Sequence, residues 1–113
     1  MDLKRVSAEL SVCGQITPED VATIAAEGYH TIICNRPDGE GADQPPFAAI
    51  EAAAKAQGIE ARYIPVESGM VTEKAIGAFG AAMQEVPHPI LAYCRSGARS
   101  STLWSLQDAL RKR

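Results

Sequence analysis

The stretch LAYCRSGARSSTLW, residues 91–104, joins an apolar run to a helical one through a short polar turn. The run PILAY, residues 89–93, is typical of a buried strand. Leucines recur at helical spacing from Ser100 to Arg111, which predicts a helix with one apolar stripe. Between the two lie a cysteine, a glycine and two arginines. The sequence therefore predicts a strand, a tight turn and a helix, with reactive side chains in the turn.

The same order of elements recurs along the rest of the chain. Short β-type runs cover residues 10–13, 29–34, 60–66 and 89–93, and helical patterns cover residues 17–27, 47–57, 72–86 and 100–111. Thr17 and Thr72 are suited to cap the helices that follow them, and Pro87 ends the third helical pattern. Such alternation is typical of a mostly parallel sheet covered by helices. We predict an α/β fold of about four strands that forms one domain over residues 1–113.

Composition excludes some classes of partner. Hydrophobic residues make up 46% of the chain, charged residues 22%, and the formal net charge is -3. No basic field favours nucleic acid or an anionic membrane. No apolar run is long enough to cross a bilayer, and the start MDLKRVSAEL lacks the apolar centre of a secretory signal. We therefore expect a cytoplasmic protein whose partners are neither nucleic acid nor membrane.

Polar residues gather just after three of the predicted strands. They are NRPDGE at residues 35–40, ESGM at residues 67–70 and CRSGARS at residues 94–100. In open α/β sheets, ligands bind beyond the carboxyl ends of the strands. We therefore expect these three clusters to meet and to form the functional site.

The third cluster has the composition of an anion-binding loop around a nucleophile. Backbone N–H groups at a strand-to-helix turn, the helix N-terminus and the nearby Arg95 and Arg99 can lower the pKa of a thiol, which favours Cys94 as a thiolate. Arg99 can offer a planar pair of donors to an oxyanion. Ser100 could donate to the thiolate and cap the helix. The loop backbone that would surround an anion is Ser96, Gly97 and Ala98.

The other candidate ligands have simpler explanations. The three cysteines, Cys13, Cys34 and Cys94, lack the paired spacing of a zinc site or a disulfide framework, so free thiols are expected. Cys34 could resolve an oxidised or persulfidated Cys94 as a disulfide, or could simply be a core residue. His30 and His88 have no second ligand at metal spacing. We expect neither a metal nor a cofactor.

Several separated motifs carry a resemblance to a known family. CRSGARS, together with NRPDGE, QPP and YIPVESGMVTEKAIGAF, resembles the phosphatase-like domain of the beta-lactamase-hydrolase-like proteins over nearly the whole chain. The resemblance implies the fold of cysteine-dependent dual-specificity phosphatases. That family's domain also occurs fused to a domain of the persulfide dioxygenase type, which implies a persulfide dioxygenase as a possible partner.

Three departures from cysteine phosphatases decide how the chemistry is interpreted. Those enzymes resemble one another in a histidine before the cysteine, five residues between cysteine and arginine, and a separate aspartate acid. Here Tyr93 precedes Cys94, and four residues separate Cys94 from Arg99. No aspartate lies between Asp43 and Asp108. The loop resembles that of rhodaneses in its length and its CRSG opening. The leading prediction is therefore a sulfurtransferase that carries sulfane sulfur on Cys94 from thiosulfate or a small persulfide to a thiol or thiophile.

Two alternatives remain open. One is a phosphatase that forms a cysteinyl phosphate on Cys94, with Glu67 or Asp38 as the general acid. Arg36 could add charge to its anion site or fix its own loop by hydrogen bonding. The other alternative is a non-catalytic module that binds a small anion or senses oxidation through its thiols.

Overall fold

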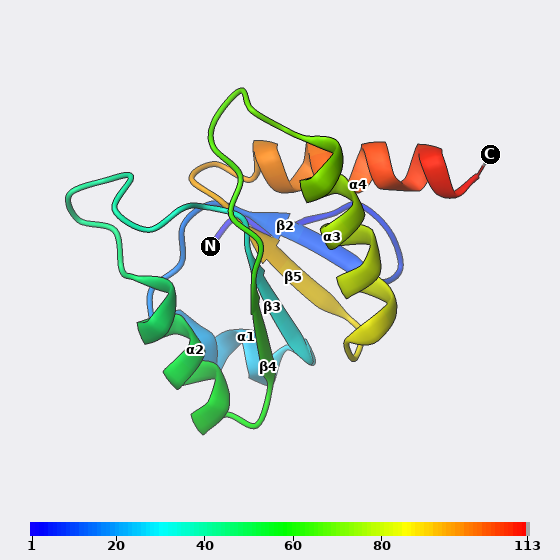
Figure 1. Cartoon of the computed structure of the whole chain (residues 1–113). Coiled ribbons are helices and arrows are strands. Elements are labelled where there is room, and N and C mark those ends of the chain that lie inside the picture. Colours follow the sequence, from blue (N-terminus) through cyan, green and yellow to red (C-terminus); the bar gives the residue numbers. More distant parts are fainter. Residues whose placement is uncertain (113) are drawn as a thin grey trace.

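The computed structural model describes residues 1–112 as a single sheet with helices on both sides (Figure 1). None of the helices within these residues is long and apolar enough to cross a bilayer. The strands are β1 (Lys4–Arg5), β2 (Leu10–Cys13), β3 (Thr31–Cys34), β4 (Glu60–Tyr63) and β5 (Ile90–Tyr93). The helices are α1 (Asp20–Ala26), α2 (Phe47–Ala56), α3 (Glu73–Glu85) and α4 (Ala98–Arg111).

The sheet has the order β1-β2-β5-β3-β4, and every pair except β1 with β2 is parallel. The predicted α/β class with a mostly parallel sheet is confirmed. The strand β1 was not predicted, because its two residues are exposed and have no apolar pattern. β5, which leads into Cys94, is the central strand and pairs with β2 and β3.

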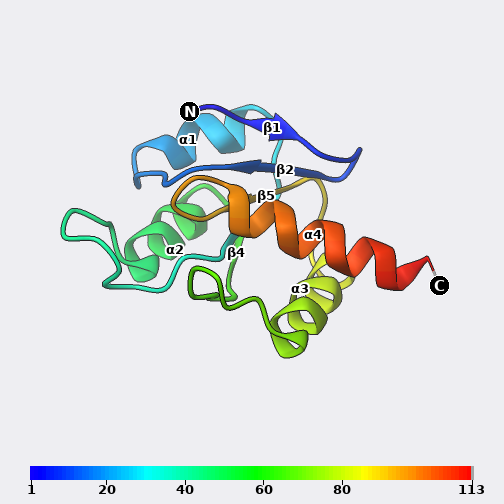
Figure 2. The same cartoon turned by 90° about the horizontal axis from the view of Figure 1, so that it is seen from above.

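Two helices cover each face of the sheet. α1 and α2 pack over Ile32, Leu91 and Tyr93, whereas α3 and α4 pack over the alternate residues Ile90 and Ala92. Figure 2 shows α1 and α2 to the left of the sheet, and α3 with most of α4 to the right. Because side chains alternate between the faces of a strand, the residue after Tyr93 is directed to the α3/α4 side.

Local hydrogen bonds explain where the helices begin. Thr17 and Asp20 exchange bonds between backbone N–H and side-chain oxygen, and the hydroxyl of Thr72 accepts from the backbone N–H of Ala75. Thr72 is the N-cap of α3, as predicted, whereas the N-cap of α1 is Glu19 and Thr17 lies in the turn before it. The helix α4 begins two residues before the predicted Ser100, since its N-cap is Gly97 with a φ of 94°. Left-handed backbone of this kind favours glycine, so the helix can turn directly out of the strand.

Candidate active site

The three polar loops meet at the carboxyl ends of the parallel strands, as the sequence predicted. Arg99 Nη1 donates to the carbonyl of Val66, just before the ESGM turn, over 2.8 Å. The same guanidinium binds both carboxylate oxygens of Glu40, in the loop after β3, over 2.8 and 2.7 Å. The loops after β3, β4 and β5 lie at the same end of the sheet in Figure 1. Arg99 therefore joins all three loops.

The sulfur of Cys94 lies inside the turn between β5 and α4. The side chain is 1% exposed, and Sγ accepts the backbone N–H of Gly97 over 3.0 Å. Burial opposes ionisation, but the backbone N–H groups of Ser100, Ser96, Arg99 and Gly97 outweigh it and lower the pKa of Cys94 below its usual value. The environment therefore favours a thiolate, as the sequence predicted.

The end of β2 supports this loop closely. A Cβ atom on Gly97 would lie 3.3 Å from the carbonyl carbon and oxygen of Cys13, and one on Gly14 would lie 2.9 Å from the carbonyl oxygen of Arg95. The N–H of Gln15 donates to that same carbonyl oxygen over 3.2 Å. The loop is therefore fixed from the side of β2 as well as from its own helix.

The hydroxyl of Ser100 has a protein partner, since its Oγ donates to Oδ1 of Asn35 over 2.8 Å. The N-cap of α4 is Gly97 rather than Ser100, and the donation of Ser100 to the thiolate stays a prediction. Asn35 in turn donates from Nδ2 to the carbonyl of Ile64 over 2.9 Å. Ser100 thus ties the start of α4 to the ends of β3 and β4, while its backbone N–H is one of those that stabilise the sulfur.

Arg99 keeps donors for a ligand. A guanidinium has five N–H bonds, and three of those in Arg99 are taken by Glu40 and Val66. The side chain also contacts Cys94 and is 10% exposed. Within residues 1–112, Nε–H and one Nη2–H have no oxygen partner, and the contact with Cys94 places this guanidinium where they could turn to an oxyanion beside the sulfur.

Glu40 is a residue of the candidate site that sequence reasoning did not single out. Besides Arg99 it binds Nε of Arg36 over 2.9 Å, and its side chain is only 26% exposed. The Arg99 hydrogen bond, assisted by Arg36, lowers the pKa of Glu40 to about 2 despite partial burial. The spacing of Arg36 and Glu40 by four residues was a local signal, but the contact with Arg99 joins residues far apart in the chain.

Arg36 fixes its loop. Its guanidinium is buried and donates from Nη1 to Oε1 of Gln15 over 3.1 Å, in addition to binding Glu40. Of its two predicted roles, these contacts support the hydrogen bonding of the loop. Arg36 reaches Arg99 only through the carboxylate that they share.

The two candidate acids occupy different places. Asp38 accepts the backbone N–H of Phe47 with Oδ1 over 2.8 Å at the start of α2. Glu67 is exposed in a turn whose backbone is closed by the N–H of Met70 over 2.9 Å. Arg95, Ser96 and Ala98 are exposed on the outer side of the loop. The acid role of either carboxyl stays a prediction.

Cys34 lies near Cys94 in the sheet but belongs to the other face. It is packed with Cys13 and Tyr93 on the α1/α2 side, and its Sγ donates to the carbonyl of Arg36 over 3.3 Å. Burial raises the pKa of Cys34 above its usual value and that of Cys13 to about 12. The side chains of Cys34 and Cys94 leave neighbouring strands on opposite faces of the sheet. A disulfide between them would require the two sulfurs to meet across the sheet. The resolving role stays an untested prediction.

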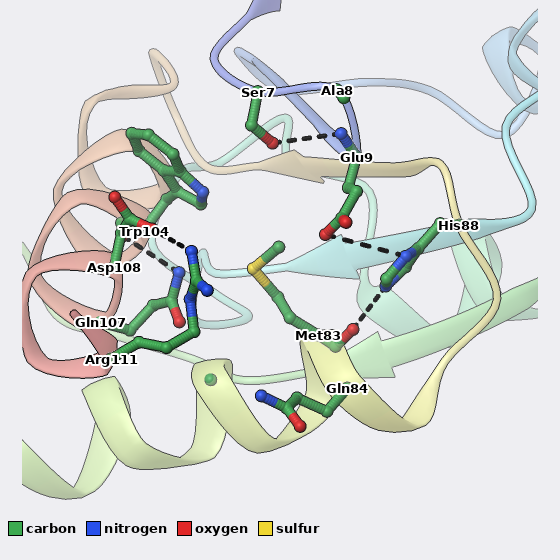
Figure 3. Close-up of a pocket in the computed structure, with 11 residues that line it drawn as sticks. Ser7, Ala8, Glu9, Met83, Gln84, His88, Trp104, Gln107, Asp108 and Arg111 are labelled. Carbon is green, nitrogen blue, oxygen red and sulfur yellow. Dashed lines mark hydrogen bonds and ion pairs between the residues drawn. The ribbon is translucent and has the colours of Figure 1, made fainter.

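A separate groove lies at the opposite end of the sheet (Figure 3). Its volume is about 470 Å³, and its lining includes Glu9, Met83, Trp104 and Asp108. Residues before β2 and before β5 contribute to it, so it lies at the amino ends of the strands. It contains no residue of the Cys94 loop.

The site combines three features: a cysteine after the central parallel strand, a loop of inward N–H groups, and an arginine at the start of the next helix. Together they define the class of phosphatase-like cysteine-loop proteins. Residues 2–111 match the family described as the phosphatase-like domain of beta-lactamase hydrolase-like protein. The chain belongs to this family, and the resemblance that the motifs indicated is confirmed.

Two relatives match nearly the whole of this chain. Beta-lactamase hydrolase-like proteins from Agrobacterium fabrum and from Xylella fastidiosa Temecula1 are 37% and 33% identical over 110 residues, which is 97% of this chain. The chain spans 26% of the length of either relative, about a quarter.

Solved structures agree on the architecture. A candidate phosphatase from Neisseria meningitidis is 33% identical with a TM-score of 0.91, and the match covers 100% of this chain and 80% of the other. The catalytic core of the PP-IP phosphatase SIW14 from S. cerevisiae has a TM-score of 0.62 at 16% identity, over 84% of this chain and 56% of the other. At that identity the likeness concerns the fold alone. The predicted resemblance to phosphatases in fold is confirmed.

Proposed function

We propose that this chain is a cysteine-dependent phosphatase, with Cys94 as the nucleophile and Arg99 as the residue that binds the phosphoryl oxygens. The observation that carries the proposal is the buried sulfur of Cys94, which accepts the N–H of Gly97 over 3.0 Å in a loop that lowers its pKa, beside the guanidinium of Arg99. The family's phosphatase-like description supports it as well. We therefore favour the phosphatase over the sulfurtransferase, which was the leading prediction from the sequence.

Catalysis would proceed in two displacements. The Cys94 thiolate attacks phosphorus, so that an S–P bond forms while the bond to the leaving group breaks and that group takes the electron pair. The loop N–H groups and Arg99 hold the phosphoryl oxygens, because charge spreads over them in the transition state. Water then attacks phosphorus, the S–P bond returns its electrons to sulfur, and inorganic phosphate and a proton are released.

Glu40 would act as a positioning residue in this reaction. It binds Nη1 and Nη2 of Arg99, so the guanidinium is held in place beside the sulfur of Cys94. Arg36 holds Glu40 in turn. A preorganised donor needs no rearrangement when charge develops on the phosphoryl group.

A sulfurtransferase remains a second candidate because of one observation, the short loop. Only four residues separate Cys94 from Arg99, which reduces the number of N–H groups available to surround a tetrahedral phosphoryl group. In that reaction the thiolate would attack the sulfane sulfur of thiosulfate, sulfite would leave with the S–S electron pair, and the persulfide would pass sulfur to a thiol.

One paired experiment separates the candidates. Purified protein and its Cys94→Ser variant are incubated with 4-nitrophenyl phosphate, and in parallel with thiosulfate followed by intact mass measurement. Phosphate release that requires Cys94 supports the phosphatase. A sulfur adduct on Cys94 without phosphate release would contradict it and favour the transferase. Tungstate binding without either reaction would also contradict it and favour the non-catalytic module.

A further inference from the structure

The carboxyl groups around Cys94 indicate which class of phosphoryl donor the site accepts. This inference rests on the proposed phosphatase function. In the first displacement the leaving group acquires a pair of electrons. A basic leaving group such as an alkoxide needs a proton from a nearby acid at that moment, whereas a weakly basic one departs as a stable anion. The loops after β3 and β4 carry four carboxyls, at Asp38, Glu40, Asp43 and Glu67.

Glu40 is the carboxyl that lies against Arg99, and it is held as a carboxylate. Both of its oxygens accept from Arg99 at 2.7 and 2.8 Å, and one also accepts from Arg36 at 2.9 Å. Two guanidinium groups stabilise the negative charge, and the pKa of Glu40 is correspondingly low. Protonation would break the ion pairs that fix Arg99, so Glu40 cannot both position the arginine and donate a proton.

Asp38 and Asp43 have other positions. The carboxylate of Asp38 accepts the first N–H of α2 at 2.8 Å, and its backbone N–H donates to the hydroxyl of Tyr63 over 2.9 Å. These bonds hold it toward α2 rather than toward Arg99. Asp43 is exposed near the far end of the same loop.

Glu67 is the remaining carboxyl and lies at the rim. It follows Val66, whose carbonyl accepts from Arg99, but its side chain is exposed in the turn. A general acid of this kind is usually sheltered in apolar surroundings. Its placement thus differs from that of a sheltered general acid.

We propose that the Cys94 site takes phosphoryl groups from phosphoric anhydrides, whose leaving group is itself a phosphate anion, and that alkyl phosphate esters are poor substrates. In the first step the Sγ–P bond forms and the bridging P–O bond breaks, so the leaving phosphate carries away the electron pair. Water then cleaves the S–P bond, and one phosphate and one proton are released. The sum is hydrolysis of the anhydride, with no acid group required.

The test is a leaving-group series with the full chain. We would measure kcat/KM for inorganic pyrophosphate, 4-nitrophenyl phosphate, phenyl phosphate and phosphoserine, with the wild type and with Glu67→Gln. Without an acid, kcat/KM for the aryl esters should fall by roughly tenfold for each unit of leaving-group pKa. Pyrophosphate should be cleaved readily and phosphoserine hardly at all. Asp43→Asn, a carboxyl at the loop's far end, is the matched control.

The outcomes separate this proposal from the proposed function. Glu67→Gln should change every kcat/KM value no more than Asp43→Asn does. A loss of about 10²–10⁴-fold for phenyl phosphate in Glu67→Gln alone would identify Glu67 as the acid and overturn the proposal, although the phosphatase would stand. Comparable turnover of phosphoserine and pyrophosphate would overturn it too. Absence of Cys94-dependent phosphate release from every member of the series would refute both.

Discussion

Cys94 and Cys34 are two buried thiols near the carboxyl ends of neighbouring parallel strands, and yet their chemistry differs. Cys94 follows β5 on the α3/α4 side, where N–H groups of the loop and of the first turn of α4 lower its pKa. Cys34 ends β3 on the α1/α2 side among apolar residues, and burial raises its pKa. Both thiols are buried, so burial does not explain the difference in their pKa values. The difference arises because the helix α4 begins beside the sulfur of Cys94, whereas none of the described helices begins beside that of Cys34.

The largest contrast should be seen when each thiol is removed. Cys94→Ser should reduce phosphate release by about 10⁴-fold or more, because the nucleophile is lost. Cys34→Ser should retain activity close to that of the wild type, since its thiol faces the other core. Steady-state release of phosphate from 4-nitrophenyl phosphate measures both. Equal losses in the two variants would mean that the proposed division of roles is wrong.

A second contrast concerns the two arginines that share Glu40. Arg99→Lys should lower kcat/KM by about 10²–10³-fold, because a lysine cannot bind Glu40 and an oxyanion in the same fork. Arg36→Lys should have a smaller effect, since Arg36 acts on Arg99 only through Glu40. The comparison is made at matched pH with both KM and kcat determined. A larger effect for Arg36→Lys would place Arg36 in direct contact with substrate.

Alkylation compares the thiols without mutation. Iodoacetamide reacts with thiolates, and the pKa of Cys94 is lowered whereas that of Cys34 is raised and that of Cys13 is about 12. At neutral pH, Cys94 should therefore be modified at least about tenfold faster than either other thiol. Its rate should rise through a pH below the usual thiol range and be slowed by phosphate. Peptide mapping of the modified protein follows each site, and modification of Cys13 or Cys34 at the rate of Cys94 would contradict the assignment.

The smallest effect concerns the ion pairs around Glu40. Its pKa is about 2 in the folded protein and roughly 4.3 in an unfolded chain, so its stabilisation is fully present above the unfolded value and is lost as the pH falls toward 2. Partial exposure reduces the contribution to about 1 kcal/mol at pH 7. Glu40→Gln should be less stable than the wild type by that amount at pH 7, and the difference should shrink between about pH 5 and 2. Urea unfolding at several pH values measures it, and a difference that does not vary with pH would contradict the ion-pair explanation.

Much of this fold could be predicted because its signals are local. The short β-type runs that became β2, β3, β4 and β5 and the cap at Thr72 all lie within a few residues of the features they define. β1 could not be predicted in this way, since two exposed residues depend on pairing with β2 rather than on their own pattern.

The site was predictable only in part, for a related reason. Cys94, Gly97 and Arg99 belong to one short motif, and their conformation follows from the turn between strand and helix. Glu40 binds Arg99 across 59 positions, and Ser100 finds Asn35 across 65, so no local pattern reveals either pair. The short loop and the missing aspartate indicated sulfur chemistry, whereas the family and its fold support a phosphatase.

The most direct test of the account is to trap the covalent intermediate on Cys94. The protein would be mixed with 4-nitrophenyl phosphate, quenched within the first turnover and analysed by intact mass and peptide mapping, with Cys94→Ser alongside. We expect a single phosphoryl group on the peptide that contains Cys94, present in the wild type and absent from the variant. Rapid release of phosphate without any phosphorylated Cys94, or a phosphoryl group on another residue, would contradict the central claim that this sulfur is the phosphoryl acceptor.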